Sequence, residues 1–454
     1  MANELKKKYG LLTAICMVVG IVVGSGVFFK AEAILKHTGG NLKLGILAWV
    51  IGGIIMIISA YAFSVMATKY EKVNGVVDYA EAAVGEKYGY IVGWFLSTIY
   101  YPTLTMALAW LSARYTLVVF LGADADISGG LCLALSAFYL IGSYALNALS
   151  PVISGKFQVS TTFIKLVPLL LMGIIGTIYG VTKGHTIENF TTVVDSTISS
   201  SDAIFSAVCA TVFAYEGWII ATSINAELKD AKRNLPKALV IGAFIIVAIY
   251  VLYYVGLAGA IPNAEMMSDG QAGAKNAFSA VFGNVMGTGI FVFVIVSCLG
   301  TLNGLMLGCS RGLYSIASRK RGPAPKVISH LDPNTNMPTN SSIVALLLCA
   351  AWLLYFYCSS LSSFSDKLGM FAFDPTELPI VTIYPFYIPI FVKMLLNKDF
   401  KGFNRYVAPI LAVAGSIFMV VAAFKAHSAE IPGYLIIFAV IMLLGIPFMK
   451  KQKI

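Results

Sequence analysis

The first long apolar segment of the chain contains Val19-Gly-Ile-Val-Val-Gly24-Ser25-Gly26-Val-Phe28, in which two glycines flank a serine. Glycine lowers the stability of a helix by about 1 kcal/mol relative to alanine, so we predict that this helix opens near its middle. The sixth apolar segment contains Phe213-Ala-Tyr-Glu216-Gly217-Trp218, again near its middle. Broken helices at the first and sixth positions of two five-span halves indicate the binding site of a secondary transporter.

The chain is too apolar for a typical soluble protein. Of its 454 residues, 58% are hydrophobic and 12% are charged, whereas soluble domains carry about 25% charged residues. A helix that crosses a bilayer needs about 20 apolar residues. Windows of this length predict an all-α membrane protein with twelve transmembrane helices, at residues 11–36, 44–68, 88–121, 131–154, 157–181, 201–225, 238–262, 284–317, 340–363, 368–393, 406–424 and 432–449.

Charge distribution predicts the orientation of these spans. Most of the 32 Lys and Arg residues fall on the face that holds both termini. Lys and Arg are enriched in cytoplasmic loops, so we expect both termini to be cytoplasmic. The chain is therefore predicted to be a multi-pass protein of the cell membrane, with short cytoplasmic tails over residues 1–10 and 450–454.

Other function classes find little support in the sequence. The net charge of +10 comes from short clusters, without the basic face and interleaved aromatics that bind nucleic acid. The seven cysteines form no CxxC pair and the four histidines fall in predicted loops, so we expect no metal and no cofactor. A phosphate-binding G-x-x-x-x-G-K-[ST] loop is missing, which disfavours an ATPase. Gly308-Cys-Ser-Arg-Gly312 fits a hydrolase pattern but lacks the strand that must precede it, so we expect no enzyme.

The two breaks offer complementary chemistry. Backbone N–H groups freed at Gly24-Ser25-Gly26, with the dipole of the half-helix that follows, suit a carboxylate. The same small residues would also suit close helix packing. Carbonyl groups freed at the second break suit an ammonium group. Phe213 could close over the substrate as a gate and Trp218 could line the pocket, or both could simply pack in an aromatic core.

Two ionisable side chains lie deep inside predicted spans. Glu216 is a functional-site candidate because a carboxylate in the membrane interior is costly; it could bind a substrate amine, bind a proton or cap a half-helix. Lys165 lies about 13 Å beyond Lys156 along the fifth span. Its ammonium needs carbonyl or hydroxyl partners, which the opened turn near Gly20 would supply. There it could brace the broken helix as a bound Na⁺ would, or form a structural ion pair.

Three further charged residues are less informative. Arg114 is expected to reach outward to the membrane surface from the end of the third span. Asp374 and Glu377 flank Pro375 in the tenth span. They could line a vestibule or simply end a short helix.

The quoted stretches, together with Asn225-Ala-Glu-Leu-Lys-Asp-Ala-Lys-Arg-Asn-Leu-Pro236, resemble motifs of the amino acid–polyamine–organocation superfamily. They are most similar to its L-type amino acid transporter branch and bacterial relatives, and the resemblance runs essentially end to end. It implies a five-plus-five inverted repeat (the LeuT-like fold), formed by residues 11–393, with two added spans over 394–449. It also implies that substrate is held between the first and sixth spans.

The resemblance implies roles for individual residues as well. It places a gate at Phe213, matches the fifth-span lysine of the family to Lys165, and matches its seventh-span tyrosine to Tyr250. With the residues argued above, the substrate-binding candidates are Val22, Val23, Gly24, Ser25, Gly26, Phe213, Ala214, Glu216 and Trp218. The candidates for bracing the first break are Gly20, Lys165, Tyr250, Ser297 and Thr301.

The chain departs from the family pattern in places. The family usually has Gly in place of Glu216, Glu in place of Val65 and Gly-Gly in place of Asn74-Gly75. The first departure leaves the charge class of the substrate open. The cysteine that links eukaryotic members to a heavy-chain glycoprotein is missing from the loop Gly122–Gly130, so we expect no such partner.

The favoured function is a sodium-independent exchanger or proton-coupled symporter of small neutral L-amino acids that works by alternating access. A monomer in the lipid bilayer is the starting expectation. The alternative is a carrier or antiporter of cationic amino acids or polyamines, with Glu216, Asp374 and Glu377 as counter-charges. An ion channel is disfavoured because no continuous polar stripe is visible.

Overall fold

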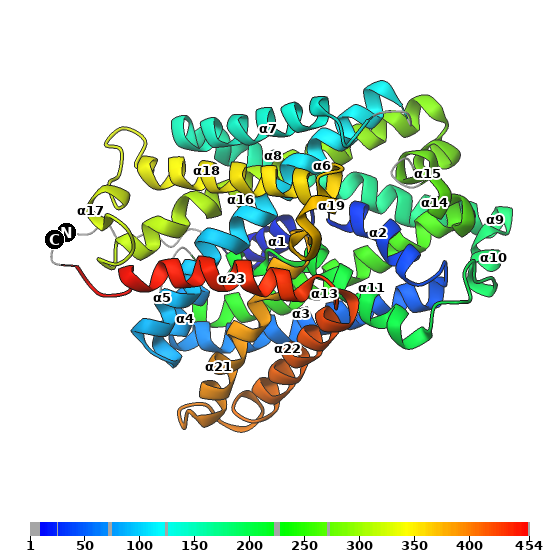
Figure 1. The fold of residues 1–454 in the computed structure, drawn as a ribbon. Helices are drawn as coiled ribbons and strands as arrows, with labels where there is room; N and C mark the ends of the chain where they lie inside the picture. Colours follow the sequence, from blue (N-terminus) through cyan, green and yellow to red (C-terminus); the bar gives the residue numbers. More distant parts are fainter. Residues whose placement is uncertain are drawn as a thin grey trace.

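The computed structural model describes residues 10–24, 26–70, 75–122, 126–221, 228–269 and 273–452, and it is helical through nearly all of these ranges (Figure 1). Ten helices in the described part of the chain are long and apolar enough to cross a membrane, and each overlaps one of the predicted spans. Some of these membrane crossings consist of two adjoining helices. The helices concerned are α3 (Leu42–Lys69), α5 (Glu86–Phe95) with α6 (Tyr101–Leu121), α7 (Gly130–Leu149), α8 (Pro151–Leu171) with α9 (Thr177–Lys183), α13 (Ala231–Ala260), α16 (Asn284–Ala317), α18 (Thr339–Phe356), α20 (Leu378–Val381) with α21 (Ile383–Leu396), α22 (Val407–Ala426) and α23 (Ile431–Gly445).

The first and sixth predicted spans are the two that do not form one long helix. The first consists of α1 (Leu11–Val22) and α2 (Gly26–His37). The sixth begins with α11 (Ser200–Tyr215) and continues into α12 (Trp218–Ala221). Both predicted breaks are therefore confirmed, and the arrangement is consistent with twelve spans.

Prolines and charges move two of the predicted boundaries. The fourth span ends at Leu149 instead of 154, because Ser150 precedes Pro151 and a residue before proline disfavours the helical conformation. The tenth span begins at Leu378 instead of 368. The segment before it holds only the short α19 (Ser365–Leu368) and one 3₁₀ turn, and it carries Asp374, Pro375 and Glu377.

Short helices cover the two ends of the bundle (Figure 1). At the left of the view lie α4 (Val76–Ala83), α17 (Pro325–Ile328) and the end of α23, which we call the terminal face. The opposite end, the far face, carries α9 and three short helices. These are α10 (His185–Thr191), α14 (Asn263–Asp269) and α15 (Gly273–Phe282).

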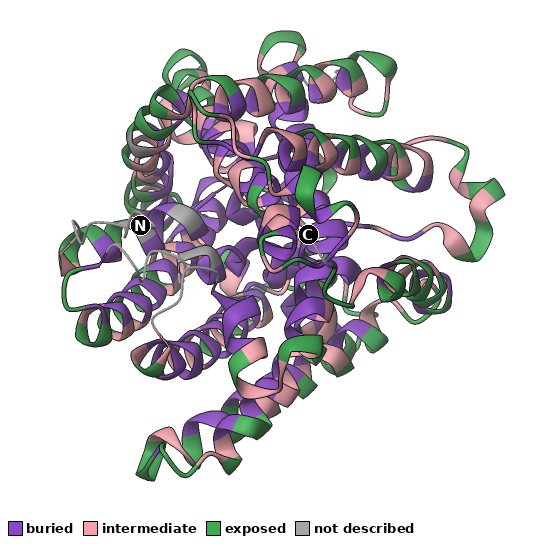
Figure 2. Ribbon diagram, turned by 90° about the vertical axis from the view of Figure 1, so that its left-hand side faces the viewer, coloured by how far each residue is buried: buried purple, intermediate pink, exposed green. Residues whose placement is uncertain are grey.

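The core of the bundle forms around α13 and α16. Helix α13 packs against α3 and α1, and α16 packs against α6 and α8. Buried residues fill the centre, whereas the exposed residues lie on the periphery (Figure 2). Many of those exposed residues are large and apolar, such as Phe120, Phe138 and Phe163. A soluble monomer rarely shows so much exposed apolar surface, so the protein is a multi-pass membrane protein whose periphery faces lipid.

Candidate functional site

The first break is an extended turn between two half-helices. Helix α1 ends at Val22, Val23 is extended (φ −65°, ψ 106°), and α2 begins at Gly26. Its glycines are required by close contacts. A Cβ at Gly24 would lie 2.7 Å from the Thr301 hydroxyl, and one at Gly26 would lie 2.5 Å from the backbone of Ala214. The small residues therefore serve packing as well as chain opening. The predicted site residue Ser25 lies outside the described residues.

Lys165 reaches the first break from α8. Its side chain is fully buried, and its Nζ donates a hydrogen bond to the carbonyl oxygen of Gly20 over 2.8 Å. No carboxylate in the described ranges lies within ion-pair distance of this ammonium, which disfavours a purely structural ion pair. The contact puts a fixed positive charge next to the last turn of α1, where helical carbonyl groups are unpaired and carry partial negative charge.

The second break is a tight turn at Glu216 and Gly217. Helix α11 ends at Tyr215, and Glu216 is extended (φ −74°, ψ 165°). Gly217 then adopts φ 103°, a conformation that L side chains rarely adopt. The glycine therefore permits the turn that ends α11 and leads into α12.

Tyr250 of α13 joins the two breaks. Its hydroxyl lies 3.1 Å from the carbonyl oxygen of Val22 and 3.0 Å from that of Ala214. Because a phenol has a single proton, its one donor is shared between the ends of α1 and α11. With the close approach of Gly26 to Ala214, this contact brings the two breaks to one place in the middle of the bundle.

Glu216 is buried and makes polar contacts without a cationic partner. Tyr100, from a π-helical turn between α5 and α6, donates a hydrogen bond to its Oε2. The notion that Glu216 caps a half-helix stays a prediction, beside a role in binding an amine or a proton. No ion pair of Glu216 occurs within the described ranges, so its charge is not committed to a protein cation.

The two aromatic candidates of the sixth span have different surroundings. Phe213 is buried below the ammonium of Lys30, which lies 5.7 Å from the ring centroid. Trp218 packs into an aromatic cluster, 5.7 Å from the ring of Phe63 and 6.2 Å from that of Tyr387. The position of Phe213 suits a gate, whereas the surroundings of Trp218 are those of aromatic core packing.

Two bracing candidates of the eighth span, Ser297 and Thr301, form no hydrogen bond with Lys165 in the described structure. The hydroxyl of Thr301 donates to the carbonyl of Ser297 in its own helix, over 3.1 Å. The hydroxyl of Ser297 is buried and has no hydrogen-bond partner among the described residues. Both lie on α16 as expected, and Gly300 between them packs against Thr161 of α8, but neither hydroxyl is hydrogen-bonded to the ammonium. Thr301 instead packs against Gly24, at the first break.

Arg114 also departs from expectation. It is buried, not extended toward the membrane surface, and its Nη2 lies 3.8 Å from Glu32 of α2. Its guanidinium lies 5.5 Å from the ring of Trp110. A counter-charge on a helix distant in sequence therefore holds it inside the bundle.

An ion-pair cluster that the sequence did not indicate lies on the far-face side of Phe213. Lys30 of α2 donates to Oε1 of Glu377, and the other oxygen of Glu377 lies 2.9 Å from Nε2 of His427. Glu377 is buried, so the vestibule expected as one alternative is closed here. The sequence did contain one signal, the position of Lys30. It follows Gly26 by four residues, so both residues lie on the same side of α2.

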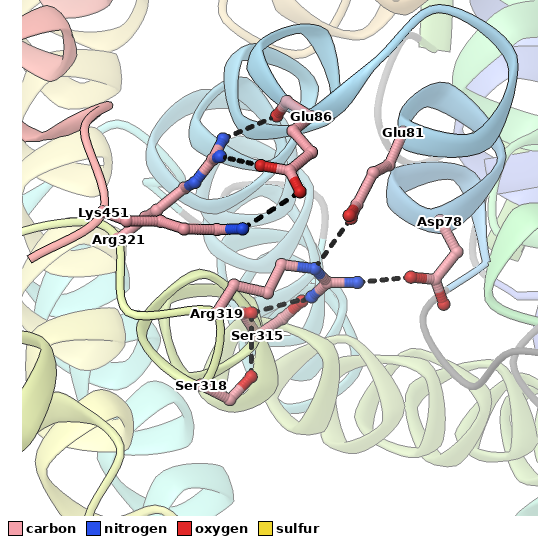
Figure 3. A network of polar contacts seen from close by, with 8 residues as sticks. All are labelled: Asp78, Glu81, Glu86, Ser315, Ser318, Arg319, Arg321 and Lys451. Carbon is pink, nitrogen blue, oxygen red and sulfur yellow. Dashed lines mark hydrogen bonds and ion pairs between the residues drawn. The ribbon is translucent and has the colours of Figure 1, made fainter.

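A second network of polar contacts joins helices at the terminal face (Figure 3). Arg319, just after α16, binds Asp78 and Glu81 of α4, the latter over 3.1 Å. Glu86, at the start of α5, is bound by Arg321 over 2.5 Å and by Lys451 over 3.0 Å. A cavity of about 430 Å³ lies among these residues. Charged contacts therefore join helices at both ends of the molecule.

Comparison with known proteins gives consistent results. Residues 9–446 match the amino acid permease family. The serine/threonine exchanger SteT of Bacillus subtilis is 31% identical over 428 residues, which cover 92% of this chain and 91% of that protein. The human b(0,+)-type amino acid transporter 1 is 25% identical over 92% of this chain and 83% of its own length. The crystal structure of MhsT in complex with L-phenylalanine shares the fold, with a TM-score of 0.64 at 13% identity, and covers 94% of this chain and all of that one.

Proposed function

The chain belongs to the amino acid permease family, and on that premise we propose that it is a secondary carrier of small neutral L-amino acids. It works by alternating access, independently of sodium, by exchange or by proton-coupled uptake. It acts in the cell membrane with both termini in the cytoplasm, as a carrier without enzymatic activity and without a linked glycoprotein subunit.

One observation carries this proposal: the two broken helices meet, and Tyr250 contacts both of them. The N-terminus of α2 offers free N–H groups and a positive dipole end to a carboxylate. The C-terminus of α11 offers carbonyl groups to an ammonium. A zwitterion such as an amino acid matches that pair of charges. The main-chain groups of the two breaks would thus recognise what all amino acids share.

Lys165 supports independence from sodium. Its ammonium already supplies a positive charge at the carbonyl of Gly20. An additional cation at the same carbonyl would repel it, so a permanent lysine replaces a bound ion at this part of the first break.

The charged contacts at the two faces support alternating access. A substrate between the breaks is covered toward the far face by Phe213 and the Lys30–Glu377 contact. Toward the terminal face it is covered by the contacts of Arg319 with α4 (Figure 3). Each set must open while the other stays closed, because simultaneous opening would make a channel.

Uptake by the purified protein in proteoliposomes tests the proposal. Labelled neutral, cationic and acidic amino acids and a polyamine are offered, with vesicles loaded with unlabelled neutral amino acid or left empty. We expect neutral amino acids to enter at the same rate in sodium and in choline. Strict dependence on sodium, or transport of no neutral amino acid, would contradict the proposal.

A carrier of cationic amino acids or polyamines is the second candidate. The absence of a protein cation beside Glu216, among the described residues, favours it, since that carboxylate is free to meet a substrate ammonium. Saturable uptake of lysine or a polyamine, with no uptake of serine or leucine, would establish this alternative.

A further inference from the structure

Three side chains that commonly bind metals meet beside the proposed gate. They are Cys209 of α11, Glu377 just before α20, and His427 just after α22. Their ligand atoms all lie within 4.8 Å of one another. Cys209 is fully buried and the side chain of His427 is 13% exposed, so the cluster has one edge open to solvent.

The donor set suits a particular class of ion. A thiolate, an imidazole and a carboxylate are ligands of Zn²⁺, and three protein ligands with a water in the fourth position make a common zinc coordination. Such ligands lie about 2.0–2.3 Å from the metal, hence roughly 3.3–3.8 Å from one another. The separations in the cluster, from 2.9 Å between Glu377 and His427 up to at most 4.8 Å, differ from this range by about 1 Å or less, so small side-chain shifts would enclose the ion. Cd²⁺, which also favours thiolate, fits the same set.

The outer partners of the cluster resemble those of a supported metal site. The second ring nitrogen of His427 lies 3.5 Å from Oε2 of Glu430, and the second oxygen of Glu377 accepts from Lys30. Metal-binding histidines and carboxylates are usually oriented by such outer contacts.

We propose that Cys209, Glu377 and His427 bind one Zn²⁺ or Cd²⁺ ion, and that the bound ion locks the far face of the carrier. Binding forms one bond each to sulfur, nitrogen and oxygen, and it releases the thiol proton and any imidazolium proton to solvent. Cys209 precedes Phe213 by four residues, so both lie on one side of α11. An ion that ties Cys209 to the ends of the tenth and eleventh spans therefore holds the gate closed.

Binding is tested directly on the purified protein, after treatment with a chelator, by titration with Cd²⁺. The ultraviolet charge-transfer absorption of the cadmium–thiolate bond reports the site. We expect one saturable equivalent in the wild type, loss of that signal in Cys209→Ser, and binding weakened by about tenfold or more in His427→Gln. Cys16→Ser removes an exposed cysteine and is the matched control, which should titrate as the wild type does.

Equal titration of the wild type and Cys209→Ser would overturn the site. Thermal unfolding without metal shows whether each variant is folded. A titration of Cys209→Ala, which removes the donor but keeps an apolar side chain, repeats the test if the serine variant unfolds.

The locking effect rests on the proposed function, whereas the binding does not. Zn²⁺ added to proteoliposomes should reduce amino acid uptake by the wild type at least about fivefold and leave Cys209→Ser unaffected. Saturable Cd²⁺ binding without any inhibition would overturn the lock. A protein that transports no amino acid at all would refute the proposed function, while the absorption titration would still decide the metal site.

Discussion

Both broken helices leave backbone polar groups without helical partners, and the polar contacts differ between the two breaks. At the first break, other helices supply the polar groups: Lys165 to the carbonyl of Gly20 and Tyr250 to that of Val22. At the second break, Tyr250 also contacts the carbonyl of Ala214, and the chain brings its own carboxylate, Glu216, which accepts from Tyr100. The first break is therefore held by side chains of other helices, whereas the second break also contains a charged side chain of its own.

The two breaks therefore differ in their sensitivity to mutation. The first depends on single residues of α8 and α13, so removing one of them exposes unpaired carbonyl groups in a buried place, which is costly. The second shares its contacts between a glycine with positive φ, a carboxylate and two tyrosines. We therefore expect mutations to affect the brace of the first break more than the carboxylate of the second.

The largest effect is expected for Lys165→Ala. A hydrogen bond from a charged group contributes about 1.5–3 kcal/mol, so uptake should fall by roughly 10- to 100-fold. Lys156→Ala is the matched control, because Lys156 lies exposed on the same helix. Initial rates in proteoliposomes, at equal reconstituted amounts, make the comparison. Equal losses in the two variants would remove Lys165 from the site.

Phe213→Ala is expected to come next. A buried Phe side chain contributes about 1.5–3 kcal/mol by burial, and loss of the ring would uncover the substrate during translocation. Uptake should fall about tenfold or more while the protein still reaches the membrane, and Phe213→Trp should retain part of the activity. Surface labelling measures how much protein reaches the membrane, and uptake measures how fast that protein transports. Full transport by the alanine variant would refute the gate.

Tyr250→Phe probes the link between the breaks. A neutral hydrogen bond contributes about 0.5–1.5 kcal/mol, so uptake should fall roughly two- to tenfold. Because Tyr250 and Lys165 both support the first break, the double variant should lose less than the product of the single losses. Strictly multiplicative losses would show that the two residues act on independent features.

Glu216→Gln is expected to change the rate least. Glutamine can still accept a hydrogen bond from Tyr100, so uptake of a neutral amino acid near neutral pH should stay within about threefold of the wild type. If Glu216 binds the coupled proton, the pH dependence of uptake should disappear in this variant. Loss of lysine or polyamine binding would instead identify Glu216 as the counter-charge of a cationic substrate. If both the pH dependence and the substrate range are unchanged, helix capping is the only one of the three roles that remains for Glu216.

Local signals in the sequence were enough to predict the breaks. Glycines beside a serine, and a carboxylate beside a glycine, interrupt apolar runs visibly in one dimension. The contact of Lys165 with Gly20 was also predictable, because a buried ammonium needs carbonyl partners and an opened helix supplies them.

Contacts that depend on helix rotation and long-range packing could not be predicted. The face of α16 that carries Ser297 and Thr301 is set by its packing against α6 and α8. Arg114 meets Glu32, and Lys30 meets Glu377 across 347 residues of sequence. Likewise, Cys209 and His427 belong to no compact motif, so the sequence predicted no metal site although the fold brings their side chains together.

The most direct test of an amino acid site between the two breaks is ligand-induced thermal stabilisation of Gly26→Ala. A ligand at about 100 times its Kd stabilises a folded protein by about 2.7 kcal/mol. The added methyl at position 26 would lie 2.5 Å from the backbone of Ala214 and force the breaks apart, whereas a methyl at Gly142 meets nothing within 4 Å. We predict that neutral amino acids raise the Tm of the wild type and of Gly142→Ala, and leave that of a folded Gly26→Ala unchanged. Full stabilisation of Gly26→Ala would contradict the account.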